Sequence, residues 1–234
     1  MSDLVAPYTT SLCLPLNWDT DLLRADLQKA LQPEWGSHYN RSDYSGHWSS
    51  IALYSATGKV SDVLALPADK FYPTPLLDEC PCFKQILDEL QFEKEAVRLL
   101  CLQAGSMVHP HRDRGLAYRF GFLRLHIPII TTSEVEFEVD GKLLDMQPGT
   151  CWYADFDAVH AVRNYSDKDR IHLVVDGRRN AWTDALFARA GYNFDAEQQP
   201  EAMDAGTLQR IIEELRQQNT PAADALIAQL TARQ

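Results

Sequence analysis

The fold of this chain is constrained most by residues 95–177, where short apolar runs alternate with turn signals. Asp140-Gly141 and Pro148-Gly149 each separate two strand-like runs. Asp-Gly and Pro-Gly pairs are typical of tight turns between antiparallel strands. Five to seven short strands at this spacing predict a barrel or jelly roll. The expected fold class is therefore mainly β with flanking helices.

The region before this β-rich stretch has a mixed pattern. Residues 20–31 and 76–92 carry apolar residues at helical spacing, and the second of these helices is expected to begin near Pro81. Residues 35–66 are rich in Trp, Tyr, Ser and Gly and predict one or two strands. The N-terminal part of the chain should thus be an α/β elaboration of the β core.

The chain becomes helical again after the β-rich stretch. Residues 181–192 and 206–217 both have apolar residues at helical spacing. A length of 234 residues fits one large domain with an appended helical piece. We expect a jelly-roll domain over residues 1–180 and a C-terminal helical extension over residues 181–234, packed on or beside the core.

Charge and composition argue against several classes of function. The net charge of −11 disfavours nonspecific binding to nucleic acid or to anionic membranes. The N-terminus lacks the features of a secretory signal, and no apolar run approaches the roughly 18 residues that span a bilayer. The 5 cysteines are an odd number without a secretory context, so reduced thiols are expected. We expect a cytoplasmic protein with no nucleic-acid or membrane partner.

One short motif predicts a metal site. His111 and Asp113 are two residues apart, so on a strand their side chains point the same way, with Cα atoms about 6.6 Å apart. His160 would complete a set of two imidazoles and one carboxylate, which is typical of non-heme Fe(II) oxygenases. His109 is the alternative strand ligand, because it shares the face of His111. Arg170 follows His160 by ten residues and could bind a carboxylate of a cosubstrate.

This motif is weak when taken alone. His-x-Asp triplets are common by chance, and His109 and Arg119 also show the ten-residue spacing. A longer series of motifs is more specific: LQAGSMVHPHRD, FLRLHIPI, QPGTCWYADF, VHAVRN and DRIHLVVDG occur in this order. Over residues 75–180 this series resembles the aspartyl/asparaginyl β-hydroxylase family, which includes bacterial proline hydroxylases. The resemblance implies a double-stranded β-helix (a cupin-like jelly roll) that uses Fe(II), 2-oxoglutarate and O₂.

The resemblance also implies roles for single residues. The metal ligands of the family, which are its catalytic centre, fall on His111, Asp113 and His160. The arginine that binds the far carboxylate of 2-oxoglutarate falls on Arg170. An Arg-x-His pair beside the cosubstrate is implied for two further positions, Arg124 and His126. For Arg124 the alternative is an ion pair with the acidic run at residues 134–138.

One position departs from the pattern of the family, and the substrate contacts are least constrained. A serine that helps to hold the cosubstrate in some relatives would fall near Leu100, which puts that contact in doubt. Asn40, Arg41 and Trp48, in the aromatic N-terminal region, are the candidate substrate contacts. His172 alternates with Arg170 on one face of its strand, and we interpret it as structural.

The function expected from these residues is hydroxylation of a C–H bond of an amino acid, coupled to decarboxylation of 2-oxoglutarate to succinate and CO₂. The amino acid could be free, carrier-bound or part of a peptide, and the protein a monomer or homodimer. Two alternatives stay open. One is a cupin-like metal dioxygenase or isomerase without 2-oxoglutarate. The other is a non-enzymatic module that binds a metal or ligand.

Overall fold

The computed structural model describes residues 8–37, 41–64 and 68–197. The chain divides into two compact units, Met1–Asn193 and Phe194–Gln234. Helix α5 (Phe194–Glu197) is the described part of the second unit. The helix expected at residues 206–217 lies outside the described residues, as does most of the expected C-terminal extension.

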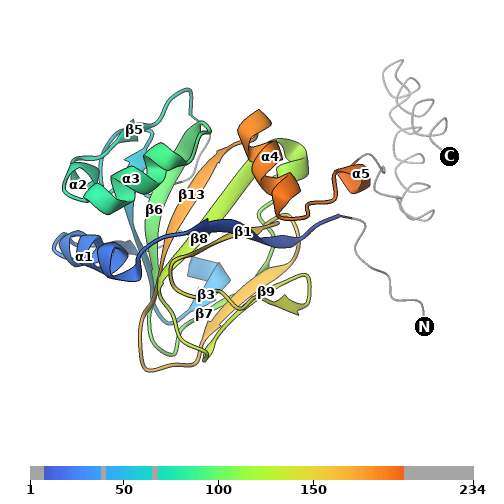
Figure 1. Ribbon diagram of the computed structural model, residues 1–234. Coiled ribbons are helices and arrows are strands. Elements are labelled where there is room, and N and C mark those ends of the chain that lie inside the picture. The colour runs from blue at the N-terminus through green and yellow to red at the C-terminus, as the bar shows by residue number, and fades with distance from the viewer. Residues whose placement is uncertain (1–7, 38–40, 65–67, 198–234) are drawn as a thin grey trace, which may run out of the picture. The chain divides into compact units, whose positions relative to one another are not determined.

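Two antiparallel β-sheets form the first unit (Figure 1). The larger sheet has the order β1-β11-β8-β13-β6-β4-β2, and β5 pairs with β4. Its strands are β1 (Ser11–Asn17), β2 (Gly36–Ser37), β4 (Trp48–Ser55), β5 (Tyr72–Pro73), β6 (Lys94–Leu102), β8 (Phe122–Ile130), β11 (Thr150–Ala154) and β13 (Arg170–Arg178). The smaller sheet has the order β10-β9-β12-β7-β3. Its strands are β3 (Tyr44–Ser45), β7 (Met107–His111), β9 (Val135–Val139), β10 (Lys142–Leu143) and β12 (His160–Asn164).

The connectivity of β6 to β13 is that of a jelly roll. Strands β6, β8, β11 and β13 lie in the larger sheet, and β7, β9, β10 and β12 lie in the smaller one. The chain therefore crosses between the sheets repeatedly, as in a double-stranded β-helix. Strands β6 to β13 are eight, whereas the sequence predicts five to seven. The two-residue strand β10 is too short to produce a strand pattern in the sequence. The Asp-Gly turn before β10 is confirmed: Asp140 and Gly141 both have positive φ, 51° and 74°, as a type I′ hairpin turn requires.

Helices cover the outer face of the larger sheet. Figure 1 shows α1 (Thr20–Ala30), α2 (Pro75–Asp78) and α3 (Pro81–Glu89) grouped beside β6, while α4 (Ala181–Arg189) contacts β1. The single helix expected over residues 76–92 is in fact two. Pro81 begins α3 at its first turn, and the preceding Cys80 has non-helical backbone angles (φ −115°, ψ 75°), as a residue before proline prefers. Two short 3₁₀ helices, Arg41–Asp43 and Tyr118–Phe120, complete the fold.

The space between the two sheets holds an apolar core. Its buried members are Leu102, Val108, Phe137, Val139, Leu144, Met146, Ala154, Phe156, Ala158 and Val162. Trp48, Tyr44 and Trp152 are partly buried and pack against this inner cluster. Because side chains alternate along a strand, the residues two positions from these also face the interior. This inner face is where the polar residues discussed below converge.

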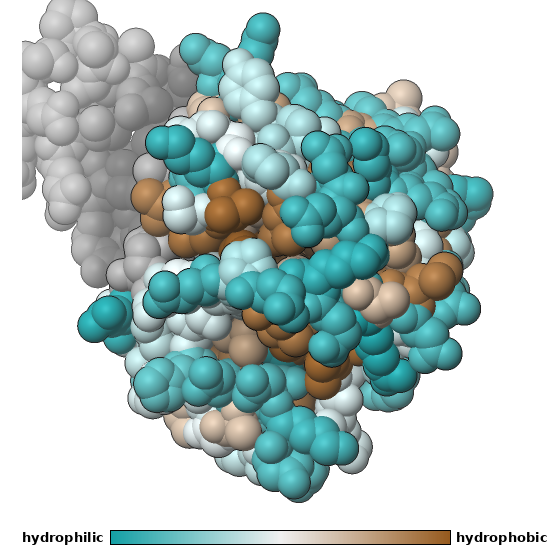
Figure 2. Space-filling model, turned by 90° about the vertical axis from the view of Figure 1, so that its left-hand side faces the viewer, coloured by the Kyte–Doolittle hydropathy of each residue, from teal (hydrophilic) through white to brown (hydrophobic). Residues whose placement is uncertain are grey.

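One face of the molecule is mostly hydrophilic. Figure 2 shows the face that carries α1 and α2, where hydrophilic residues surround separate apolar patches. Large exposed apolar side chains include Leu22, Leu31 and Tyr72. Apolar side chains exposed in this way are normal for a folded domain. Among the described residues, no helix is long and apolar enough to cross a membrane.

The close approach of β13 to the segment before β6 generates a testable prediction. A Cβ added at Gly177 would clash with the ring of Phe92 and lie 2.6 Å from the carbonyl oxygen of Glu93. We expect Gly177→Ala to lower the free energy of unfolding by about 1–3 kcal/mol, measured by urea denaturation. Gly36→Ala is the matched control, since a Cβ there meets only the Ser50 carbonyl oxygen at 3.9 Å. Equal stability of the two variants would contradict this packing.

Candidate metal centre

Two histidines meet because their strands are neighbours in the smaller sheet. Strands β7 and β12 pair antiparallel, and His160 lies directly opposite His111 in the register. The centroids of the two imidazole rings are 4.2 Å apart, with an angle of 55° between the ring planes. A separation of 49 residues in sequence thus becomes direct contact, because both side chains project from the same face of the sheet.

Asp113 is brought to the histidines by a loop, and not by strand alternation as the sequence predicts. Strand β7 ends at His111, so Asp113 is not on a strand with it, and alternation does not explain their convergence. Instead, the backbone N–H of Asp113 donates to the carbonyl oxygen of Phe156 at 2.8 Å. The loop between β11 and β12 thereby holds Asp113 beside the histidines. One nitrogen of each histidine and one carboxylate oxygen of Asp113 lie within 4.8 Å of one another.

The histidines are oriented as metal ligands. Nδ1 of His111 lies 2.7 Å from the carbonyl oxygen of His109, and Nδ1 of His160 lies 3.1 Å from that of Ala158. A carbonyl only accepts, so each Nδ1 carries a proton, and Nε2 is the ring nitrogen that each histidine can offer to a metal. Burial, together with the adjacent His111, lowers the pKa of His160 to about 4. His160 is therefore neutral at neutral pH, which is the state that binds metal.

The alternative ligand His109 lies elsewhere. Its Nε2 is 2.8 Å from the hydroxyl oxygen of Ser45 on β3. His109 does not belong to the group of convergent ligand atoms found among the described residues. The donor set that does converge, two imidazoles and one carboxylate, fits Fe(II) with coordination positions left open.

Asp113 is the first member of a buried chain of charges, a series of ion-paired side chains that extends into the core. Arg124 donates from Nη1 to Asp113 at 2.9 Å and from Nε to Asp176 at 2.6 Å. Arg98 donates to the same Asp176 at 2.7 Å. The side chains of Arg98 and Asp176 are 4% and 5% exposed, so this is a fully desolvated pair. Asp176 was missed in the sequence, although its two-residue spacing from the other inner-face positions of β13 was a usable signal.

The positive charge of Arg124 helps to lower the pKa of Asp113. Burial alone would raise the pKa of Asp113, but the guanidinium of Arg124 and the two adjacent histidines outweigh it and lower that pKa. Asp113 is therefore an anion when it meets a cation. The acidic run proposed as an alternative partner of Arg124 pairs with Arg163 instead, at 2.9 Å to Glu138.

A second polar cluster lies deeper between the sheets and contains a cation without a buried acid. Arg170 is 3% exposed, its Nη2 donates to Nδ1 of His172 at 2.8 Å, and its guanidinium lies 5.3 Å from the centre of the Phe137 ring. Burial lowers the pKa of Arg170 to about 9, which leaves it protonated at neutral pH. In the described parts of the chain, no carboxylate lies within ion-pair distance of it. A buried guanidinium in this state is a ready site for an anion.

His126 lies between the two clusters. Its Nδ1 is 3.4 Å from Nδ1 of His172, and its ring stacks on Phe156 with centroids 5.3 Å apart. The ring of Phe156 in turn lies 4.6 Å from that of His160. His126 and His160 thus flank one phenylalanine, which connects the deep cluster to the metal ligands through direct contacts.

Of the three candidate substrate contacts, the structure describes two, Arg41 and Trp48, and they lie in different surroundings. Trp48 faces the interior, where its ring meets that of Tyr44 edge-on at 5.8 Å. Arg41 is exposed in a 3₁₀ helix, and Asn40 lies outside the described residues. Trp152 also faces the interior, since it packs against the inner cluster and is the register partner of His126. Both tryptophans therefore pack against the inner cluster, which also contains Phe156, a neighbour of His160.

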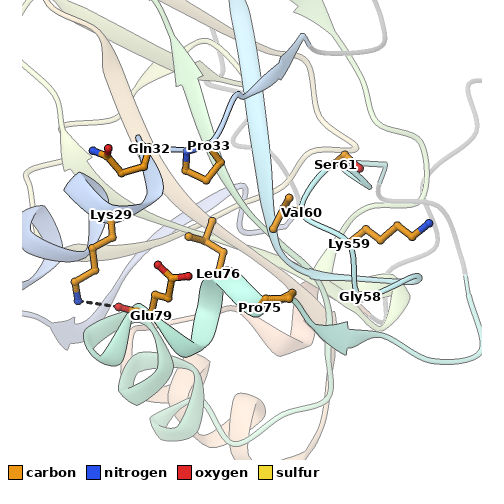
Figure 3. Close-up of a pocket in the computed structure, with 10 residues that line it drawn as sticks. All are labelled: Lys29, Gln32, Pro33, Gly58, Lys59, Val60, Ser61, Pro75, Leu76 and Glu79. Carbon is orange, nitrogen blue, oxygen red and sulfur yellow. Dashed lines mark hydrogen bonds between the residues drawn. The ribbon is translucent and has the colours of Figure 1, made fainter.

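A surface groove away from these clusters does not belong to the site. It has a volume of about 710 Å³ and lies among the end of α1, the turn after β4, and α2 (Figure 3). Its lining residues are Lys29, Gln32, Pro33, Gly58, Lys59, Val60, Ser61, Pro75, Leu76 and Glu79. Its Lys29 is already engaged by Asp26 at 2.9 Å and by the Glu79 carbonyl oxygen at 2.8 Å. The groove is lined neither by the metal ligands nor by Arg170.

The fold and the site define a jelly-roll protein with a candidate two-histidine, one-carboxylate metal centre. The sequence profile described as aspartyl/asparaginyl β-hydroxylase matches residues 17–180, which is more than half of the chain. The chain belongs to the aspartyl/asparaginyl β-hydroxylase family. The family resemblance seen in the sequence is thus confirmed.

Two curated relatives are similar over part of their length. L-proline cis-4-hydroxylase of Rhizobium meliloti (strain 1021) is 26% identical over 176 residues, covering 73% of this chain and 61% of the relative. L-proline cis-3-hydroxylase 1 of Streptomyces sp is 27% identical over 141 residues, covering 56% of this chain and 47% of the relative. The chain spans about half to three fifths of the length of these relatives.

One solved structure bears on the fold. An oxidoreductase of the 2OG-Fe(II) oxygenase family from Burkholderia pseudomallei superposes with a TM-score of 0.51 and 15% identity, covering 73% of this chain and 86% of that structure. The expected mainly β fold with a double-stranded β-helix core is confirmed.

The metal centre generates a prediction with a natural control. We expect His160→Ala to weaken binding of Fe(II) or Co(II) by more than about 100-fold, since it removes a ligand rather than an outer-shell partner. His109→Ala removes a histidine two residues from His111 that contacts Ser45 instead. It should bind the metal like the wild type, measured by anaerobic titration calorimetry. Similar losses in both variants would contradict the assigned ligands.

The buried ion pairs generate a prediction about stability. Asp176→Asn would leave Arg98 and Arg124 without their shared anion, so we expect the free energy of unfolding to fall by about 3–5 kcal/mol. Asp78→Asn is the control, because Asp78 pairs with Lys84 through exposed side chains (72% and 56%). Its effect should stay below about 1 kcal/mol. A small effect at Asp176 in urea denaturation would argue against a desolvated pair.

Proposed function

We propose that this protein is an Fe(II)/2-oxoglutarate-dependent oxygenase that hydroxylates a C–H bond of an amino acid. The observation that carries the proposal is the pairing of two clusters between one pair of sheets. One cluster holds two imidazoles and an ionised carboxylate that fit a metal, and the other holds a buried cation with no carboxylate within ion-pair distance among the described residues. A dicarboxylic 2-oxo acid needs both, because one of its ends chelates a metal and the other is an anion.

His111, Asp113 and His160 would hold the iron. Fe(II), when bound, supplies the activation of O₂, for which no amino-acid side chain has the chemistry. The role of the chain is to orient these ligands: two backbone carbonyls set the tautomers of the histidines, and Arg124 keeps Asp113 ionised and in place. Phe156 and the rest of the inner cluster exclude water from one side of the site.

Arg170 would bind the far carboxylate of 2-oxoglutarate in a charge-assisted contact. His126 stands between Arg170 and the metal ligands and would lie beside the chain of the cosubstrate. The overall reaction converts the substrate C–H, 2-oxoglutarate and O₂ to C–OH, succinate and CO₂, so that atoms balance.

The substrate we propose is a free, small amino acid. Both curated relatives are named L-proline hydroxylases, which supports proline or an amino acid of similar size over a peptide. Trp48 and Trp152 offer apolar surface for a small aliphatic ring at the edge of the inner cluster. Arg41 and Asn40 stay predictions as contacts for its polar groups.

The proposal is tested by succinate formation and by binding. We expect anaerobic Fe(II)-loaded protein to develop the weak visible band of an Fe(II)–2-oxo acid chelate when 2-oxoglutarate is added. In air, one or more of the twenty amino acids should stimulate succinate release. Arg170→Ala should weaken 2-oxoglutarate binding by at least about 30-fold, as expected for truncating one member of a buried charge pair.

Arg178→Ala is the matched control for this experiment. Arg178 lies on the same strand but pairs with Glu95 at the surface, and its side chain is 42% exposed. It should bind 2-oxoglutarate like the wild type. Iron uptake without any 2-oxoglutarate binding would instead indicate a cupin-like metal enzyme that does not use this cosubstrate. Absence of iron uptake by folded protein would indicate a binding module.

A further inference from the structure

Several buried polar atoms on the inner face of the larger sheet have no hydrogen-bond partner among the residues that the structure describes. Arg170 Nε, His172 Nε2 and the hydroxyl oxygen of Ser50 are among them. All three residues are at most 3% exposed. A buried polar group without a partner is costly, so such groups together mark a place where a polar molecule binds.

The register places Ser50 and His172 in one row of the sheet. Leu100 on β6 pairs with Ser50 of β4 on one side and with His172 of β13 on the other. The adjacent row is Trp48, Leu102 and Arg170, and it faces the interior because Trp48 and Leu102 belong to or pack on the inner cluster. Alternation along each strand then turns the row of Ser50 to the same side.

The hydrogen bonds decide which atoms of this row donate. A guanidinium only donates, so His172 Nδ1 accepts from Arg170 and must be unprotonated. Burial and the neighbouring Arg170 also lower the pKa of His172 well below its usual value, so the ring is neutral. The single ring proton is therefore on Nε2. Ser50, His172 and Arg170 thus present an O–H and two N–H donors that have no acceptor.

The spacing of the row suits one carboxylate. Strands two apart in a sheet are separated by about 9.6 Å, and Leu100 forms an apolar floor between them. A carboxylate can accept hydrogen bonds from both sides at once, since its two oxygens offer about four lone-pair sites. Donors without acceptors beside an unneutralised guanidinium match an anion that carries acceptors only.

We infer that Ser50 and His172 bind the far carboxylate of the 2-oxo acid together with Arg170, an inference that rests on the proposed function. The side chain of Leu100 cannot donate a hydrogen bond, and Ser50 supplies a hydroxyl from the neighbouring strand in the same row. His172 is then a binding residue, whereas the sequence pattern alone predicts only a structural role for it.

The test compares two serines on one strand with two ligands. Ser50→Ala removes the inward hydroxyl, and Ser49→Ala is the control, because Ser49 alternates to the outer face, where it pairs with Cys101. Binding to anaerobic Fe(II)-loaded protein is measured by calorimetry and by the visible chelate band. The ligands are 2-oxoglutarate and 2-oxopentanoate, which has a methyl group in place of the far carboxylate.

We expect Ser50→Ala to weaken 2-oxoglutarate binding about tenfold, as for the loss of a hydrogen bond to a charged group. Binding of 2-oxopentanoate should change less than about twofold. Ser49→Ala should affect neither ligand. In the absence of ligand, Ser50→Ala should melt at the same temperature as the wild type or higher, because it removes an unsatisfied buried hydroxyl. His172→Phe should show the same dependence on the ligand, provided that its melting curve shows a folded protein.

The failure of this inference differs from failure of the proposed function. If the wild type binds 2-oxoglutarate and Ser50→Ala binds it equally well, the hydroxyl is satisfied by water and the inference is overturned. An equal loss of both ligands in Ser50→Ala would also overturn it, since that indicates general damage to the site. If the iron-loaded wild type binds neither ligand, the proposed function fails and the inference fails with it.

Discussion

The site depends on the hydrogen bonding of β13 in the middle of the larger sheet. This strand pairs with β6 on one side and β8 on the other over most of its length. A strand held on both edges cannot slip by one residue without turning every side chain to the opposite face. Its alternation therefore places Arg170, His172 and Asp176 on the inner face together, and the chemistry of the site follows from those three positions.

The two ends of β13 differ in whether their buried charges are paired. At one end, Asp176 lies opposite Arg124 in the register and also binds Arg98, and Arg124 binds Asp113, so two cations meet two anions. Such a closed set of charges holds the metal-ligating carboxylate in place. At the other end, Arg170 donates to the neutral imidazole of His172, and among the described residues no carboxylate lies within ion-pair distance of it. The paired charges around Asp176 are suited to a structural role. Arg170, which has no paired carboxylate among the described residues, is suited to binding an anion.

The smaller sheet contributes the two histidines of the metal site, and aromatic residues lie between them and the larger sheet. His111 and His160 face each other across β7 and β12, while Phe156 lies between His160 and His126 of the opposite sheet. The ring of Phe156 thus makes an apolar contact with a histidine of each polar cluster. Under the proposed function, the two histidines of the smaller sheet and Asp113 would hold the metal, and Arg170 of the larger sheet would bind the far carboxylate of the same 2-oxo acid.

The sequence by itself determined the strand periodicity, the Asp-Gly turn, the metal-ligand candidates and Arg170, because these depend on local spacing and on residue chemistry. It could not determine that Asp113 reaches the histidines from a loop held by Phe156, that Arg124 pairs with Asp176 rather than with the acidic run, or that Ser50 shares a row with His172. Only the tertiary structure decided these contacts. The register between strands distant in sequence sets which side chains meet, and that register is fixed by burial and hydrogen bonding across the whole sheet.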